Sequence, residues 1–118
     1  MMANKTRTYR VAEQLRSVLA ASLLHMNDPR FELVTLTHVK VSADLGHAKV
    51  YWTVSGTEFD IDQIQSAFDK AAGYFKRTLG QELELRTIPQ LRFYYDDTLD
   101  TAEQVERLLA SVQSDSVE

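Results

Sequence analysis

The 118-residue chain contains no cysteine, which excludes a disulfide framework, a thiol nucleophile and a thiolate metal site. No apolar run approaches the length of a membrane span. The N-terminal segment MMANKTRTYR also lacks the apolar stretch that a secretion signal requires. These absences predict a cytoplasmic protein that makes no contact with a membrane.

Motifs that carry chemistry are also missing. The four glycines match neither a phosphate-binding loop nor a dinucleotide fingerprint, and no serine lies in a recognisable nucleophile motif. The three histidines, His25, His38 and His47, do not have the spacing of metal ligands. The sequence therefore predicts no catalysis, no metal, no cofactor and no small-molecule substrate.

Charge is unevenly distributed along the chain, which has a formal net charge of −4. Residues 1–95 carry 12 Lys and Arg against 10 Asp and Glu (+2), whereas residues 96–118 carry 1 Arg against 7 acids (−6). Local field and not net charge governs contact with phosphates. The body of the chain can therefore present a basic surface to RNA although the whole chain is acidic.

The first half of the chain predicts a helix followed by a β-hairpin. Apolar residues recur at helical spacing over residues 7–26, and Asn27-Asp28-Pro29-Arg30 ends that pattern. Alternating residues over 33–42 and 47–55 indicate two antiparallel strands. The first strand changes parity near Thr37-His38, which predicts a bulge there.

A long helical pattern over Ile61 to Leu85 organises the rest of the chain, with Asp60 as its expected N-cap. Gly73 interrupts it, although an interior glycine costs about 1 kcal/mol relative to alanine. One interpretation is a tolerated glycine or a slight bend. The other is a helix-kink-helix, in which the N–H groups that open the second helix bind an anion. The joint would consist of Ala71, Ala72 and Gly73, with Lys70, Lys76 and Arg77 around it.

A third strand is expected over Gln90 to Asp96, followed by a last helix from about Thr98. Alternation in this strand puts Arg92 and Tyr94 on its outer face, either as phosphate and stacking contacts or as ordinary outward residues under the last helix. Because a helical crossover precedes this strand, it can run parallel to one strand of the hairpin. The expected fold is an α+β two-layer sandwich with a three-stranded mixed sheet and its helices on one face. We expect one domain over residues 1–112 and a polar, acidic, disordered tail over 113–118.

Two further groups of charged residues have open interpretations. Arg7 and Arg10 lie near the expected start of the first helix, where cations oppose the helix dipole. They either contact an anion or belong to a solvated helix start. The acids Asp96, Asp97 and Asp100 fit capping at a helix N-terminus, and a cryptic carboxylate active site is the enzymatic alternative.

Several short motifs occur in one order along the chain. They are Arg7-x-x-Arg10-Val11, Asp28-Pro29-Arg30, Val34-Thr35, Ser42-x-Asp44-Leu45-x-x-Ala48-Lys49-Val50-Tyr51, Ala71-Ala72-Gly73-Tyr74-Phe75-Lys76-Arg77 and Leu85-Arg86-x-x-Pro89-x-Leu91-x-Phe93-x-x-Asp96. In this order and spacing they resemble the bacterial ribosome-binding factor A family. The resemblance implies a type II KH-like fold of order α-β-β-α(kink)α-β-α.

The resemblance also implies a function and a set of contacts. The expected function is binding to the free small ribosomal subunit and non-catalytic help with late maturation of its rRNA, including 5′-end processing and growth in the cold. The protein is expected to be a monomer. The alternative is a protein-interaction or dimerisation module without RNA contact. The expected RNA and ribosome contacts are Arg7, Arg10, Arg30, Lys70, Ala71, Ala72, Gly73, Lys76, Arg77 and Arg86.

Overall fold

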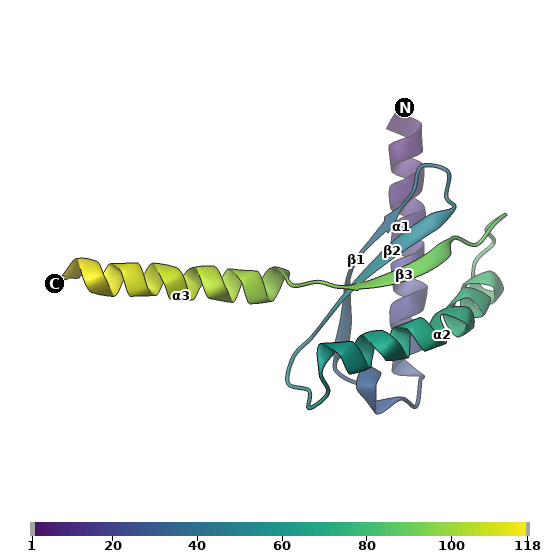
Figure 1. Cartoon of the computed structure of the whole chain (residues 1–118). Coiled ribbons are helices and arrows are strands. Elements are labelled where there is room, and N and C mark those ends of the chain that lie inside the picture. The colour runs from purple at the N-terminus through teal and green to yellow at the C-terminus, as the bar shows by residue number, and fades with distance from the viewer. Residues whose placement is uncertain (1, 118) are drawn as a thin grey trace.

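The computed structural model describes the backbone of residues 2–117 and the side chains of residues 6–111. Figure 1 shows a sheet with helices against it and one helix that extends away. In chain order the elements are α1 (Met2–Leu24), the 3-10 turn η1 (Pro29–Phe31), β1 (Val34–Val41), β2 (His47–Val54), α2 (Ile61–Glu82), β3 (Gln90–Tyr95) and α3 (Thr98–Val117). This is the α+β sandwich with a mixed sheet that the sequence predicts.

The sheet has the strand order β1-β2-β3, with β1 antiparallel and β3 parallel to the central strand β2. The β1–β2 register shifts between Leu36 and His38, so the predicted bulge is confirmed. Val50 of β2 pairs with Val39 of β1 and Phe93 of β3, and all three side chains are buried. One face of the sheet therefore carries an apolar row across all three strands.

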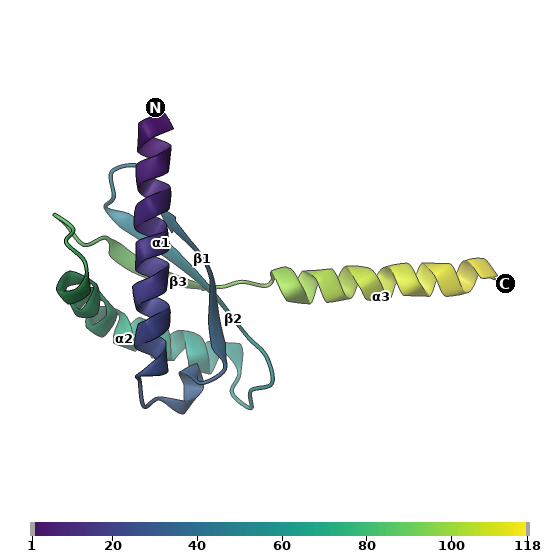
Figure 2. The same cartoon turned by 180° about the vertical axis from the view of Figure 1, so that it is seen from behind.

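α1 and α2 both cover this apolar face, as Figures 1 and 2 show from opposite sides. An aromatic cluster fills the space between the layers. The Phe68 ring lies 4.7 Å from that of Phe93, 5.4 Å from that of Trp52 and 4.7 Å from that of Phe31. Burying a large apolar side chain stabilises a fold by roughly 1.5–3 kcal/mol. This cluster therefore fixes α2 and η1 against the sheet.

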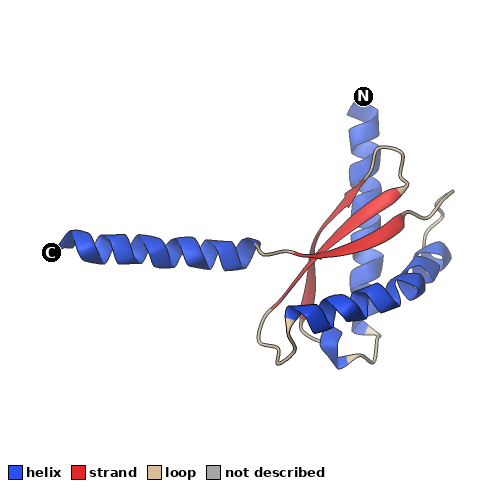
Figure 3. Cartoon of the chain, in the orientation of Figure 1, coloured by secondary structure: helices blue, strands red, loops and turns tan. Residues whose placement is uncertain are grey.

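The two separate half-helices expected around Gly73 are wrong, because α2 is one continuous α-helix. Its ribbon curves without a break in Figure 3, which agrees with the other interpretation, a tolerated glycine or a slight bend. The helix begins at Asp60, the predicted N-cap, whose side chain accepts a hydrogen bond from the backbone of Gln63 in a capping box. The buried residues Phe68 and Phe75 lie on one helix face on either side of Gly73. Because a break would take the two rings out of register, packing outweighs the small helix penalty of one glycine.

α1 begins at Met2, earlier than expected, so Arg7 and Arg10 do not lie in its first turn. The helix dipole acts mainly within the first turn, and the argument that these cations oppose it is therefore wrong. Val11, Leu15 and Leu19 of the predicted apolar face are buried against the sheet. Within the described residues no helix is long and apolar enough to cross a membrane.

α3 starts at the predicted residue but does not cover the sheet, and it extends away from the sandwich in Figures 1 and 2. Its apolar side chains are exposed, with 67% of Leu108 and 57% of Leu109 accessible. The helix continues to Val117, through most of the segment expected to form a disordered tail. Residue 118 of that tail lies outside the described residues. The single domain over residues 1–112 stays a prediction.

Candidate nucleic-acid interface

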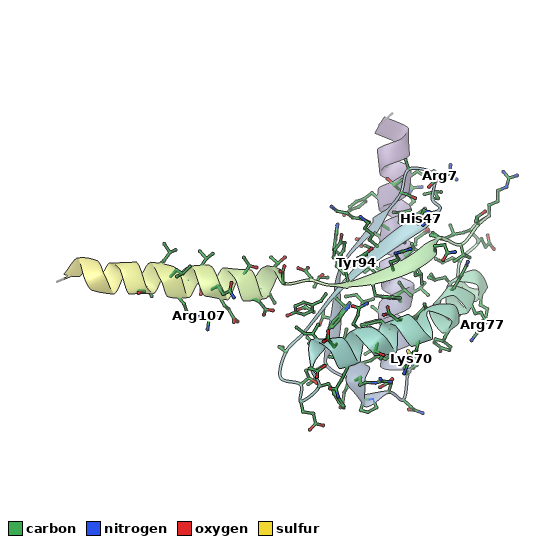
Figure 4. The ribbon with its side chains drawn as sticks, in the orientation of Figure 1. Arg7, His47, Lys70, Arg77, Tyr94 and Arg107 are labelled. Atoms are coloured by element: carbon green, nitrogen blue, oxygen red, sulfur yellow. The ribbon has the colours of Figure 1, made fainter. Side chains whose placement is uncertain are left out.

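The exposed face of α2 brings together three predicted contacts. Lys70 and Arg77 are seven residues apart, close to two helical turns, so they lie along one side of the helix. Both point away from the sheet in Figure 4. Lys76 is exposed on the same helix. Among the described side chains the ion pairs are Arg16–Glu13 and Arg30–Asp28, so none of these three α2 cations is neutralised by a carboxylate.

Gly73 lies on the exposed face between these cations. A Cβ atom at this position would have Arg77 Nη1, at 3.9 Å, as its nearest neighbour beyond the local helix. The position is therefore open, and a bound chain can approach the helix backbone closely there. The N–H groups here belong to the interior of α2, so the expected helix N-terminus for an anion is absent. Ala71 and Ala72 are half-buried against the core and do not share this open surface.

Arg7 and Arg86 meet at a different place, around a cleft of about 370 Å³ beside the β1–β2 turn. Asp44 and Glu84 also line this cleft, so its charge is mixed. The carboxylate of Asp44 accepts hydrogen bonds from Ser42 Oγ at 2.6 Å and from the backbone of Gly46 at 2.9 Å. These two bonds lower the pKa of Asp44, which keeps the carboxylate charged beside the two arginines.

Arg30 is already paired. Its guanidinium donates two hydrogen bonds to the carboxylate of Asp28, at 3.0 and 2.8 Å. The side-chain bond to Arg30 lowers the pKa of Asp28 and raises that of Arg30. An RNA phosphate would have to compete with this carboxylate. Arg30 is therefore a weaker candidate contact than the cations of α2.

Arg10 lies apart from the α2 cations, on a groove of about 620 Å³ formed by α1 and Leu83. Tyr9 and Glu13 line the same groove. The structure thus divides the predicted basic strip into separate groups. They are the exposed face of α2, the mixed cleft at Arg7 and Arg86, the α1 groove at Arg10 and the paired Arg30.

Two of the carboxylates considered as an alternative active site, those of Asp96 and Asp100, are used in local structure. Asp96 accepts hydrogen bonds from Thr37 Oγ1 at 2.7 Å and from the backbone of Thr98 at 3.0 Å. The hydroxyl of Tyr95 donates to Asp100. The bond from the Thr98 backbone fits the predicted capping role for Asp96, and the bond from Thr37 ties the start of α3 to the bulge in β1. Asp100 makes a different contact, to a side-chain hydroxyl.

A second group of cations lies on the uncovered face of the sheet. The sequence offers Arg92 of this group as a possible phosphate contact, but sequence reasoning missed Lys40 and Lys49 beside it. Lys40, Lys49 and Arg92 are opposite one another in the strand register. The alternation of each strand indicated which side chains point outward. Only the pairing between strands, which is not local in sequence, placed these three in one row.

The fold and its surface define a small α+β domain with unpaired cations on an exposed helix, suited to a polyanionic partner. Comparison with known proteins is more specific. The family model of ribosome-binding factor A matches residues 7–109, and the chain belongs to this family. It is 42% identical to ribosome-binding factor A of Thioalkalivibrio sulfidiphilus over 105 residues, covering 88% of this chain and 81% of that protein. It is 38% identical to that of Nitrosospira multiformis over 120 residues, covering 100% and 95% of the two chains.

Solved structures agree with the assignment. The crystal structure of ribosome-binding factor A from Thermus thermophilus matches with a TM-score of 0.67 and 25% identity, covering 75% of this chain and 93% of that chain. A solution NMR structure of a putative ribosome-binding factor A from Thermotoga maritima matches with a TM-score of 0.66 and 28% identity, covering 75% of this chain and 85% of that chain. A homology model of Thermus thermophilus ribosome-binding factor A has been fitted into a cryo-EM map of its complex with 30S. It matches with a TM-score of 0.62 and 25% identity, covering 72% of this chain and 90% of that chain.

Proposed function

We propose that this protein binds the free small ribosomal subunit and assists late maturation of its rRNA without catalysing a reaction. The observation that carries the proposal is the exposed face of α2, where Lys70, Lys76 and Arg77 surround the open position of Gly73. The Thermus thermophilus relative whose homology model was fitted into the map of a 30S complex supports the small subunit as the partner. Help with 5′-end processing, growth in the cold and a cytoplasmic location belong to the same proposal.

In the proposed mechanism the protein holds immature rRNA in one arrangement and performs no chemistry on it. Lysine and arginine contacts to phosphates orient a protein on RNA without reading its sequence. Because each contact releases counterions, binding weakens as salt rises. The KH-like order of elements supports an RNA contact, but the continuous α2 lacks the loop with which ordinary KH domains clamp the backbone. Recognition would therefore depend on rRNA shape and on a close approach at Gly73.

The test is co-sedimentation of small subunits with the variants Arg77→Glu and Arg107→Glu across a salt series. Both arginines are exposed on helices, and each substitution lowers the net charge by two, so they form a matched pair (Figure 4). We expect Arg77→Glu to weaken binding and to reduce its salt dependence, while Arg107→Glu behaves as the wild type. Equal binding of both variants would show that α2 is not the contact surface.

The second candidate function is a protein-interaction or dimerisation module, favoured by the exposed apolar side chains of α3. Leu99 is 62% accessible and Val105 49%. The leading proposal predicts a monomer whose subunit binding is unaffected by Leu108→Glu. Light scattering coupled to size exclusion, run on the wild type and this variant, distinguishes the two. A dimer that Leu108→Glu dissociates would favour the second function.

A further inference from the structure

The face of the sheet opposite α1 and α2 carries two ordered rows of side chains. Figure 1 shows that neither helix covers this face, and that α3 leaves it open. The strand register places His38, Tyr51 and Tyr94 opposite one another as one row. The neighbouring row is formed by Lys40, Lys49 and Arg92. From strand geometry each row is about 10 Å long, and the two rows lie about 7 Å apart.

The rings of the aromatic row are neighbours and are moderately tilted relative to one another. The ring centroids of His38 and Tyr51 are 6.0 Å apart with an interplanar angle of 34°, and those of Tyr51 and Tyr94 are 5.7 Å apart at 31°. Tyr51 lies between the other two rings, and Tyr94, on the edge strand β3, is 38% accessible. Aromatic surface left open on a sheet is available for stacking with a planar ligand group.

The cationic row is unfavourable for the fold by itself. Like charges directly opposite one another in a sheet destabilise it. Lys49 is opposite a cation on both sides, and none of the three is in an ion pair within the described residues. The segments of β1, β2 and β3 contain no aspartate or glutamate at all. An anionic ligand on this face would relieve the repulsion.

We infer that this sheet face binds a single-stranded segment of RNA, with bases stacked on Tyr51 and Tyr94 and phosphates held by the row of Lys40, Lys49 and Arg92. An aromatic row beside a cationic row matches the two parts of a nucleotide strand, and this pairing is typical of surfaces that bind single strands. A duplex hides the faces of its bases, so it cannot stack on the rings in this way. The site lies on the opposite side of the sheet from α2 and is a second RNA contact.

Within this chain the acidic helix α3 is the segment that could compete with RNA for the cationic row. Hydrogen bonds at its start hold α3 away from this face of the sheet. The carboxylate of Asp96 bonds to both Thr37 and Thr98, and the hydroxyl of Tyr95 bonds to Asp100. These bonds direct α3 outward from the end of β3 (Figure 2). RNA is favoured over an acidic protein segment because aromatic rings form half of the surface. The inference rests on the proposed function only in taking RNA as the natural partner.

The experiment measures fluorescence anisotropy of a labelled ten-nucleotide single-stranded RNA of mixed sequence, with a duplex of equal length as comparison. The variant Tyr51→Leu/Tyr94→Leu removes the rings but keeps apolar bulk, and Tyr51→Phe/Tyr94→Phe is its matched control because it keeps the rings. We expect the leucine variant to bind the single strand at least about tenfold more weakly and the phenylalanine variant to bind as the wild type. Duplex binding should change little in either.

A second measurement tests the cationic row. Lys49→Gln/Arg92→Gln should reduce the slope of log affinity against log salt by about 1.4 for the single strand, since each phosphate contact contributes about 0.7. Thermal melts check that each variant folds. If the double leucine variant does not fold, Tyr94→Leu alone replaces it, because Tyr94 is exposed on an edge strand.

Three results would overturn the inference. They are unchanged single-strand binding by the leucine variant, an unchanged salt slope in the glutamine variant, and displacement of the RNA from this face by a synthetic peptide of residues 98–117 with tighter binding than the RNA. The proposed function fails by a different result, equal sedimentation of Arg77→Glu and Arg107→Glu with subunits. The two failures are therefore distinguishable.

Discussion

Replacing Gly73 by alanine tests the surface of α2 most directly, because it separates stability from binding. Gly73 is exposed in the interior of a continuous helix. A new Cβ would meet only Arg77 Nη1, at the ordinary contact distance of 3.9 Å. Alanine is favoured over glycine in a helix interior by about 1 kcal/mol. We therefore expect Gly73→Ala to raise the free energy of unfolding by about that amount, or about 4 °C in Tm.

Gly80→Ala is the matched control for this substitution. A Cβ at Gly80 would lie 3.8 Å from Ile88 Cγ1, so this position is also open, but it falls in the last turn of α2. We expect a smaller gain in stability there, because helix ends fray. If an RNA backbone approaches the helix at Gly73, the added methyl group at 73 will weaken subunit binding while the one at 80 will not.

Thermal unfolding followed by circular dichroism, together with subunit co-sedimentation, measures both effects. A lower Tm for Gly73→Ala would refute the reasoning, because it would mean that the helix is strained or closely packed at this glycine. Higher stability with unchanged binding would keep the helix geometry but remove Gly73 from the proposed interface.

Three further predictions concern stability. Phe68→Ala should cost about 3–5 kcal/mol in urea unfolding because it empties the centre of the core, whereas Tyr74→Ala, 43% accessible on the same helix, should cost far less; similar losses would contradict the packing. Hydrogen bonds from Thr98 and Thr37 lower the pKa of Asp96, so its contribution is present above the unfolded pKa and is lost as pH falls through the folded pKa. The Tm of the Asp96→Asn variant should therefore fall less than the Tm of the wild type between about pH 5 and pH 2. Parallel curves of Tm against pH for the two proteins would contradict this role of Asp96. Removal of residues 98–118 should leave the Tm within about 2 °C, because the apolar side chains of α3 are exposed, and a large fall would show that α3 belongs to the folded core.

Local features of this protein were predictable from the sequence because their causes lie within a few residues. The change of parity at Thr37-His38 predicted the bulge, and Asp60 predicted the start of α2. Asp28-Pro29-Arg30 predicted the end of the first helix for the same reason. The outward direction of Arg92 and Tyr94 followed from strict alternation in the third strand.

The break expected at Gly73 shows where local reasoning failed. A glycine changes helix stability by about 1 kcal/mol, and sequence alone gives no measure of the packing that opposes it. Phe68 and Phe75 bury their rings on one helix face on both sides of the glycine, which keeps α2 continuous. The interface therefore differs from the expected one. In place of free amides at the start of a second helix, the structure has cations around an exposed glycine in the middle of α2.

The sequence by itself determined the order of the elements, the apolar face of each one and the family to which the chain belongs, since these depend on periodicity and on motifs in fixed order. Only the tertiary structure decided which charges meet. It paired Arg30 with Asp28, separated Arg7 and Arg86 from the cations of α2, and aligned Lys40, Lys49 and Arg92 across three strands. The physical reason is that these neighbours depend on strand register and helix packing, which join residues far apart in the chain.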